Sequence, residues 1–265
     1  MARVGIITGS GTYALPDFDV ADAHDLETPF GAALVTEGTF AEQTALHVSR
    51  HGEGHKRLSN HVNHRANIWA LRELAADCVI GCTACGALEP DQVLGGVIVF
   101  DELHYVGNRL ADGSLCTLFA EAGHPERGHW IIGPPFSGPL RQALVAAAEA
   151  TGVTARDGGC YGHVDGPRFN TRTEIAGLAA IGVTAVSQTG GPETVLCGEA
   201  QLPYALIGYA TDYANGVHEE ATPVEELIRL MGESTDTFAS VLAAAMPALD
   251  AASMTPPGVV YRFEH

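Results

Sequence analysis

The fold is most constrained by two short apolar segments, Val183–Val186 and Tyr204–Ala210, which flank a stretch of helical character at Glu193–Gln201. Short apolar runs bounded by turn residues are typical of buried strands. A turn is expected at Gly190-Gly191-Pro192, with Pro192 near the first turn of the helix, where proline is tolerated. Strand, helix and strand in this order predict an α/β fold.

Polar residues follow both apolar segments: Gln188 and Thr189 after the first, and Thr211 and Asp212 after the second. Ligands of open α/β sheets bind beyond the ends of strands, so these four residues are candidates for a binding site. The alternative is that Thr189 and Asp212 only cap the segments that follow, a common role for Thr and Asp. The local pattern leaves both interpretations open.

The composition excludes several classes of partner. The chain has 265 residues, 46% of them hydrophobic, and no repeat or linker, so we expect a single domain over residues 1–265. A net charge of −18 argues against a nucleic-acid partner, because no basic block is present to displace counterions. No apolar run is long enough to span a membrane, and the N-terminal residues lack the layout of a signal peptide.

The cysteines lie mostly in apolar or Gly- and Ala-rich surroundings: Cys78, Cys82, Cys85, Cys116, Cys160 and Cys197. This favours reduced, packed thiols and a cytoplasmic location. Cys82 and Cys85 match a C-x-x-C pattern, which leaves a redox role as an alternative, but no second pair completes a zinc site.

The strand predicted at Arg3–Thr8 runs into Gly9-Ser10-Gly11. Backbone N–H groups in such a turn can form an anion-binding nest, with the Ser10 hydroxyl as a further donor. The alternative is a dinucleotide-binding loop over residues 9–14. Pro16 weakens that alternative, because the dinucleotide motif needs a long helix at this point.

Two more predicted strand ends carry suitable side chains. The strand Thr44–Ser49 leads into Arg50 and His51, and a guanidinium offers paired donors to an oxyanion. The strand 78–82 leads into small residues from Thr83 to Ala87, which let a ligand approach the backbone, although tight strand packing explains them equally well. A zinc-protease motif at His51 and His55 is rejected, because the intervening glycines disfavour a helix.

Four amphipathic or Ala-rich stretches are predicted to be helices: 61–76, 139–151, 171–181 and 224–245. Thr171 and Glu174 have the spacing of a capping box. Loops are expected over 103–128 and a short strand over 129–132. Phe169, in a Gly-Pro-Arg turn, is suited to stacking on a flat ligand.

Eight motifs occur along the chain: Gly9-Ser10-Gly11, Thr28-Pro29-Phe30-Gly31, Arg50-His51-Gly52, Val62-Asn63-His64-Arg65-Ala66-Asn67-Ile68-Trp69-Ala70-Leu71, Thr83-Ala84-Cys85-Gly86, Gly166-Pro167-Arg168-Phe169, Gly191-Pro192-Glu193 and Ala210-Thr211-Asp212-Tyr213. In order and spacing they resemble the trimeric purine nucleoside phosphorylases, specifically the 5′-methylthioadenosine phosphorylase branch. The resemblance covers roughly residues 3–225.

The resemblance implies a mixed β-sheet flanked by helices, the nucleoside phosphorylase fold, assembled as a homotrimer or a dimer of trimers with an active site at each subunit boundary. It implies attack of phosphate on C1′ of a purine nucleoside, which gives the free base and a ribose 1-phosphate. No metal or organic cofactor takes part. The expected substrate is 5′-methylthioadenosine or another 5′-deoxy-5′-substituted adenosine.

The resemblance also implies roles for individual residues. Phosphate is expected at Ser10, Arg50, His51, Thr83, Ala84 and Thr189. Base and ribose contacts are expected from Phe169, Asn170, Gln188, Asp212 and Ala214. Asp212 is expected to protonate the departing purine, which requires a raised pKa. The 5′ substituent is expected beside Val224 and beside His129 of a neighbouring subunit.

Three positions depart from the family pattern. Ala214 replaces a second acid, Gln188 replaces the Met that usually packs on the ribose, and His64 replaces a Tyr. These changes leave a 6-oxopurine nucleoside, such as inosine or methylthioinosine, as an alternative substrate. The sequence is also compatible with a non-catalytic purine-binding protein and, through residues 9–14, with a nucleotide-dependent oxidoreductase.

Overall fold

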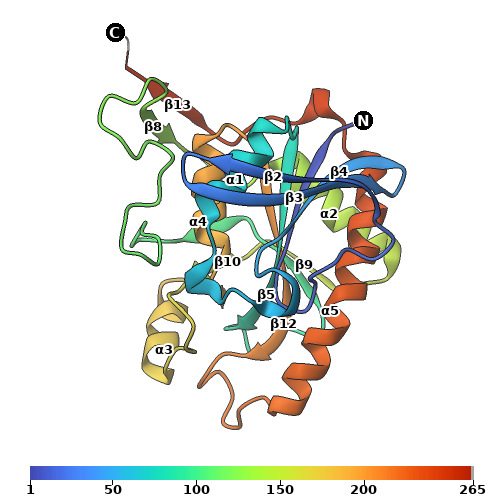
Figure 1. The fold of residues 1–265 in the computed structure, drawn as a ribbon. Coiled ribbons are helices and arrows are strands. Elements are labelled where there is room, and N and C mark those ends of the chain that lie inside the picture. Colours follow the sequence, from blue (N-terminus) through green and yellow to red (C-terminus); the bar gives the residue numbers. More distant parts are fainter. Residues whose placement is uncertain (264–265) are drawn as a thin grey trace.

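The chain is organised around one mixed β-sheet, described for residues 1–263 by a computed structural model (Figure 1). Within these residues the sheet has eleven strands. They are β1 (Val4–Thr8), β2 (Asp19–Thr28), β3 (Gly31–Phe40), β4 (Gln43–Ser49), β5 (Cys78–Ala87), β6 (Val97–Val99), β7 (Glu102–His104), β9 (Ala155–Asp157), β10 (Cys160–His163), β11 (Val183–Ser187) and β12 (Tyr204–Tyr213). The order is β2-β3-β4-β1-β5-β11-β10-β7, and β12, β6 and β9 branch from β5.

Helices cover both faces of the sheet: α1 (His64–Glu73), α2 (Gly138–Thr151), α3 (Arg172–Ala180), α4 (Gly190–Glu199) and α5 (Val224–Ala245). On one face α2 and α5 form a core with β1, β5, β6 and β12, and on the other face α1 and α4 form a second core. A smaller apolar cluster lies under α3. Single 3₁₀ turns occur at Glu53–His55, Ser59–His61, Met246–Ala248 and Ala251–Ser253.

A separate two-stranded antiparallel sheet joins β8 (Gly128–Ile131) to β13 (Val259–Arg262), at the upper left of Figure 1. His129 lies on β8 and faces solvent, with its ring 5.5 Å from that of Phe263.

Strand β5 has a gap along one edge. Its first residues, Cys78–Gly81, pair with β1 in parallel, and its last two, Gly86 and Ala87, pair with β11 in the antiparallel direction. On that edge no paired residue is described for positions 82–85, while the other edge pairs with β12 along nearly its whole length. Residues 82–85 are therefore left without a strand partner on one side at the centre of the sheet.

The predicted α/β architecture, a mixed sheet with flanking helices, is confirmed, and α5 begins and ends at the predicted residues. The capping box of Thr171 and Glu174 is also present. That residues 1–265 form one domain stays a prediction. Strand β2 was not predicted, because most of its residues are polar and exposed and only pairing with β3 makes it a strand.

Three local predictions were wrong. The glycines Gly190 and Gly191 lie in the first turn of α4 and not in a turn before it. The predicted strand ends at Cys82 and Ala210 lie inside longer strands, because β5 and β12 pair with each other out to Ala87 and Tyr213. Small residues are tolerated there because the two neighbouring backbones approach closely.

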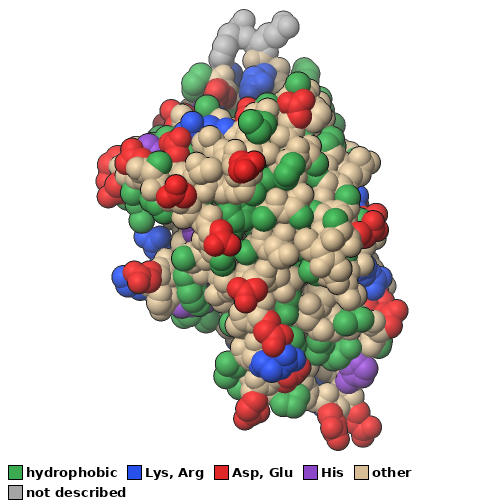
Figure 2. Space-filling model, turned by 90° about the vertical axis from the view of Figure 1, so that its right-hand side faces the viewer, with side chains coloured by type: hydrophobic (Ala, Val, Ile, Leu, Met, Phe, Trp, Pro, Cys, Tyr) green, Lys and Arg blue, Asp and Glu red, His purple; other side chains and the backbone are tan. Residues whose placement is uncertain are grey.

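Asp and Glu side chains are scattered over the face shown in Figure 2, and Lys and Arg side chains are few there. This agrees with the net charge of −18. Within residues 1–263, no helix combines the length and the apolar character needed to cross a bilayer.

The packing of α5 against the sheet yields a stability prediction. Phe238 is 1% exposed, with its ring 6.0 Å from that of Tyr209. Phe238→Ala should lower the free energy of unfolding by about 3–5 kcal/mol, because it removes buried apolar area and leaves a cavity. Ile228→Ala, at a 63% exposed position on the same helix, should change it by less than about 0.5 kcal/mol. Urea denaturation checks both values, and similar losses in the two variants would contradict this packing.

Candidate active site

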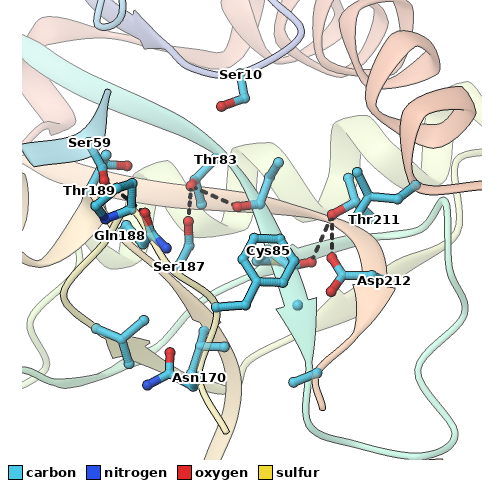
Figure 3. Close-up of a pocket in the computed structure, with 18 of the residues that line it drawn as sticks. Ser10, Ser59, Thr83, Cys85, Asn170, Ser187, Gln188, Thr189, Thr211 and Asp212 are labelled. Carbon is cyan, nitrogen blue, oxygen red and sulfur yellow. Dashed lines mark hydrogen bonds between the residues drawn. The ribbon is translucent and has the colours of Figure 1, made fainter. Parts of the chain in front are cut away.

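A cavity of about 210 Å³ lies at the gap in β5 (Figure 3). Strands β1, β4, β5 and β12 run parallel, so their C-terminal ends meet at this edge, and β11 arrives antiparallel to β5 from the opposite direction. Most of the predicted site residues line the cavity: Ser10, His51, Thr83, Ala84, Phe169, Asn170, Gln188, Thr189, Asp212 and Ala214. The structure brings together ten residues that are scattered over the sequence.

One end of the cavity is rich in hydroxyl groups. The Thr83 hydroxyl donates to the Ala84 carbonyl and is 2.9 Å from the Ser187 hydroxyl (Figure 3). Thr189 lies at the N-terminus of α4, and its side chain makes no capping hydrogen bond. Hydroxyl donors beside the positive end of a helix dipole suit an anion.

Arg50 does not line the cavity, which differs from the prediction. Its guanidinium is 1% exposed and donates to both carboxylate oxygens of Glu193, with Nε–Oε1 and Nη2–Oε2 distances of 2.5 and 2.9 Å, and to the Cys82 carbonyl. The Tyr204 hydroxyl also donates to Glu193. A buried guanidinium requires such a partner, because an unpaired charge in the core is strongly destabilising.

The buried pair lies directly beneath the loop after β1. A side chain at Gly9 would collide with the guanidinium of Arg50, so glycine is needed there. Burial alone would raise the pKa of Glu193, but the adjacent Arg50 holds it low, and the pair is therefore ionised and electrically neutral as a unit.

His51 lines the same end of the cavity, and one of its ring nitrogens already makes a hydrogen bond within the protein. Its Nδ1–H donates to the Arg57 carbonyl at 2.7 Å, and its ring stacks on His55 at 4.3 Å. Burial and then the neighbouring Arg50 lower the pKa of His51 to about 4. The ring is therefore neutral near pH 7.

Asp212 lies across the cavity from Ser59, Gln188 and Thr189 (Figure 3). The register of β12 against β5 shifts between Ala210 and Asp212, an irregularity that re-aims side chains next to a site. Burial raises the pKa of Asp212, and a 2.8 Å hydrogen bond from the Thr211 hydroxyl partly opposes that shift. The carboxyl group is thus biased towards holding a proton.

Gln188 is fixed at both ends of its amide. Oε1 accepts from the Ser59 hydroxyl at 2.7 Å, and Nε2 donates to the Arg168 carbonyl at 3.0 Å. Ser59 and Gln188 also border a second cavity of about 370 Å³, so together they separate the two spaces. Phe169 is 61% exposed at the mouth of the first cavity.

Two predicted residues lie away from the cavity. Val224 is 65% exposed at the start of α5, and the wall is instead formed by Leu227 and Met231 from the next turns of that helix. His129 on β8 does not line the cavity of its own chain. The i, i+4 spacing of Leu227 and Met231 in the sequence indicates that they share one face of the helix. It does not indicate which part of the protein that face contacts.

Several competing interpretations of the sequence lose support. No helix follows β1 before β2, as a dinucleotide-binding loop would require. Thr189 is at the N-cap position of α4 but makes no side-chain cap bond, and Asp212 lies within β12, so neither side chain caps a helix. Burial raises the pKa of the Cys82 thiol to about 12 and that of Cys85 still higher, which disfavours redox chemistry. Among residues 1–263, no three His, Cys, Asp or Glu side chains are placed to hold a metal ion.

Comparison with known proteins gives a consistent result. Residues 3–247 match the phosphorylase superfamily. A probable 6-oxopurine nucleoside phosphorylase of Thermococcus kodakarensis is 32% identical, over 93% of this chain and 92% of the relative. An S-methyl-5′-thioadenosine phosphorylase of Saccharolobus solfataricus is also 32% identical, over 94% and 90%. The crystal structure of methylthioadenosine phosphorylase from Schistosoma mansoni in complex with adenine superposes with a TM-score of 0.83 at 28% identity, covering 94% of this chain and 93% of that one. The nucleoside phosphorylase fold expected from the sequence is confirmed.

The raised pKa of Asp212 makes stability depend on pH in a defined direction. The folded state holds this proton more tightly than the unfolded state, so stability is lost as the pH rises from the unfolded pKa through the folded one. Asp212→Asn cannot ionise, so its melting temperature relative to the wild type should rise between about pH 4 and about pH 8. Thermal denaturation at both pH values checks this. Asp236→Asn, at an exposed position of α5, is the control, and a pH-independent difference for Asp212→Asn would contradict the assignment.

Proposed function

The chain belongs to the phosphorylase superfamily and is a purine nucleoside phosphorylase, and we propose that its substrate is a 5′-deoxy-5′-substituted adenosine, with 5′-methylthioadenosine as the default. The observation that carries this proposal is the division of one cavity into a hydroxyl-lined end, a carboxyl group opposite, and an apolar wall from α5. Each part matches one part of the reacting complex.

Phosphate is proposed to occupy the end formed by Ser10, Thr83 and Thr189. Hydroxyl donors can hold several of its oxygens beside the positive end of the α4 dipole, and Arg50 supports that end from beneath Gly9. The N–H groups of Thr189 and Gly190 already donate to the Tyr161 hydroxyl. One phosphate oxygen then attacks C1′ while the bond from C1′ to the purine breaks. The electron pair of that bond moves into the purine ring.

Asp212 is proposed to protonate the departing purine at N7. Burial raises the pKa of this carboxyl group and so favours its protonated form, which can release the proton as negative charge develops on the base. The same group has a second oxygen that can accept from an exocyclic amine. Donor and acceptor together complement adenine, which presents N7 as an acceptor and its 6-amino group as a donor.

The sugar is proposed to lie between Gln188 and α5. The amide of Gln188 and the hydroxyl of Ser59 suit the sugar hydroxyls, while Leu227 and Met231 suit an apolar group on C5′. This orientation favours a 5′-thioether over a free 5′-hydroxyl, because the hydroxyl would face apolar side chains.

We also propose a homotrimer in which His129 reaches the cavity of a neighbouring subunit. His129 is exposed and remote from the cavity of its own chain. Exposed apolar side chains surround it on the same small sheet, notably Ile131 and Tyr261. Apolar surface of this kind is typical of a contact between subunits.

A second candidate substrate is a 6-oxopurine nucleoside. Ala214 offers no acid beside Asp212 to select an amine, and relatives of similar identity are named as 6-oxopurine and S-methyl-5′-thioinosine phosphorylases. Such a base presents two acceptors at N7 and O6, so Asp212 would satisfy only one of them. Adenine remains the better match.

The assigned roles predict different kinetic effects at the two ends of the cavity. Asp212→Ala should lower kcat about 10²–10⁴-fold with little change in KM for phosphate, because it removes the proton donor. Ser10→Ala should raise KM for phosphate roughly tenfold with a smaller effect on kcat, because it removes one hydrogen-bond donor. Steady-state kinetics with phosphate as the varied substrate separates these effects. Equal and small changes in both variants would contradict the roles.

Substrate choice is tested with adenosine, 5′-methylthioadenosine, inosine and 5′-methylthioinosine in the presence of phosphate. The highest kcat/KM is expected for 5′-methylthioadenosine, roughly tenfold or more above adenosine. Release of free base and appearance of ribose 1-phosphates are the measurements. Much faster turnover of the inosine compounds would overturn the adenosine proposal, and binding without base release would overturn the catalytic roles.

A further inference from the structure

The anion end of the cavity carries no net positive charge. Among the described residues, no Lys or Arg side chain lines the cavity, and the charge of the nearby Arg50 is balanced by its bidentate pairing with Glu193. Anion recognition here therefore depends on hydrogen bonds whose donors and acceptors must match those of the ligand. An incoming anion meets a polar but neutral surface.

His51 contributes an acceptor to that surface. A carbonyl oxygen can only accept, so the 2.7 Å contact with Arg57 fixes the proton of His51 on Nδ1. Nε2 makes no hydrogen bond within the described residues and is not enclosed by protein, on a ring that lines the cavity. In the neutral ring Nε2 has a lone pair and no hydrogen.

The surroundings of His51 keep it in this form. The charged or titratable groups that face it are Arg50 on one side, His55 stacked on its ring, and Glu193 behind Arg50, while Arg57 contributes its carbonyl. His55 is itself hydrogen-bonded through Nδ1 to the Tyr13 hydroxyl at 2.9 Å. The Arg57 carbonyl and Glu193 favour a second proton on His51, but burial and Arg50 outweigh them, and the charge of Glu193 is already paired with Arg50.

We infer that His51 makes this end of the cavity selective for a tetrahedral oxyanion that carries its own proton, because Nε2 accepts a hydrogen bond from P–OH and repels an oxyanion without a hydrogen. The inference rests on the proposed phosphate site and specifies which anions that site selects. Both forms of inorganic phosphate near neutral pH have a P–OH group, and arsenate has the corresponding As–OH group. Sulfate has none, so one of its oxygens would face the lone pair of Nε2.

Such a mismatch discriminates between ligands of nearly equal size and shape. An unmatched polar contact is an effective way to reject the wrong ligand. When two acceptors face each other, both lose their hydrogen bonds to water and form none in return. The neutral surroundings sharpen the effect, since no unpaired cationic side chain among residues 1–263 lines the wall to compensate the charge of a fully deprotonated dianion.

Isothermal titration calorimetry of the full-length wild-type enzyme with phosphate, arsenate and sulfate at matched ionic strength tests the inference. Near neutral pH, phosphate and arsenate should bind with similar Kd values, and sulfate about tenfold or more weakly. His51→Gln provides an amide that can donate, so its ratio of sulfate to phosphate Kd should fall towards one. His61→Gln, at an exposed position outside the cavity, should keep the wild-type ratio.

Lowering the pH provides a second test that needs no variant. As the pH falls towards the pKa of His51, Nε2 gains a hydrogen and becomes a donor, so the disadvantage of sulfate should shrink in the wild type. Equal binding of sulfate and phosphate by the wild type near neutral pH would overturn the inference alone and leave the phosphate site intact. An unchanged ratio in His51→Gln would do the same. Failure of all three anions to bind would overturn the proposed phosphate site together with the inference.

Discussion

The site depends first on the buried ion pair between Arg50 and Glu193. The two residues are 143 positions apart in sequence, and their contact ties the end of β4 to the first turn of α4, beneath the loop after β1. Bonds from the guanidinium to the Cys82 carbonyl and from Tyr204 to Glu193 add β5 and β12 to the same cluster. Because neither charge tolerates being buried alone, the elements that form the hydroxyl-lined end of the cavity are held in one arrangement.

The mixed direction of the sheet explains why the cavity has two chemical ends. Four parallel strands bring hydroxyl groups and the Asp212 carboxyl to one edge, and antiparallel β11 delivers Gln188 and Thr189 into the gap beside β5. The gap leaves room for a ligand without breaking the sheet, since β12 continues to pair along the other edge of β5. The apolar wall comes from α5, which packs against the face of the sheet and extends past its edge.

Where a local pattern and the family resemblance agree, the structure places the predicted residues in one cavity. Ser10, Thr83, Thr189 and Asp212 lie at or near predicted strand ends, and all of them line the cavity. Arg50 is the informative exception: no local signal shows that its charge is matched by a distant Glu, so burial behind the cavity could not be foreseen.

Tertiary context accounts for the other differences. Strand β2 exists through pairing with β3 rather than through apolar character, and the wall residues Leu227 and Met231 are specified by where α5 packs. The role proposed for His129 requires a second subunit, so a single chain does not contain it.

The most direct measurement is a crystal structure of the protein with inorganic phosphate and a non-reactive nucleoside analogue bound together. Phosphate is expected among Ser10, Thr83 and Thr189 and the purine edge against Asp212, with the sugar between Gln188 and α5. Phosphate bound away from those hydroxyl groups, or a purine out of reach of Asp212, would contradict this arrangement.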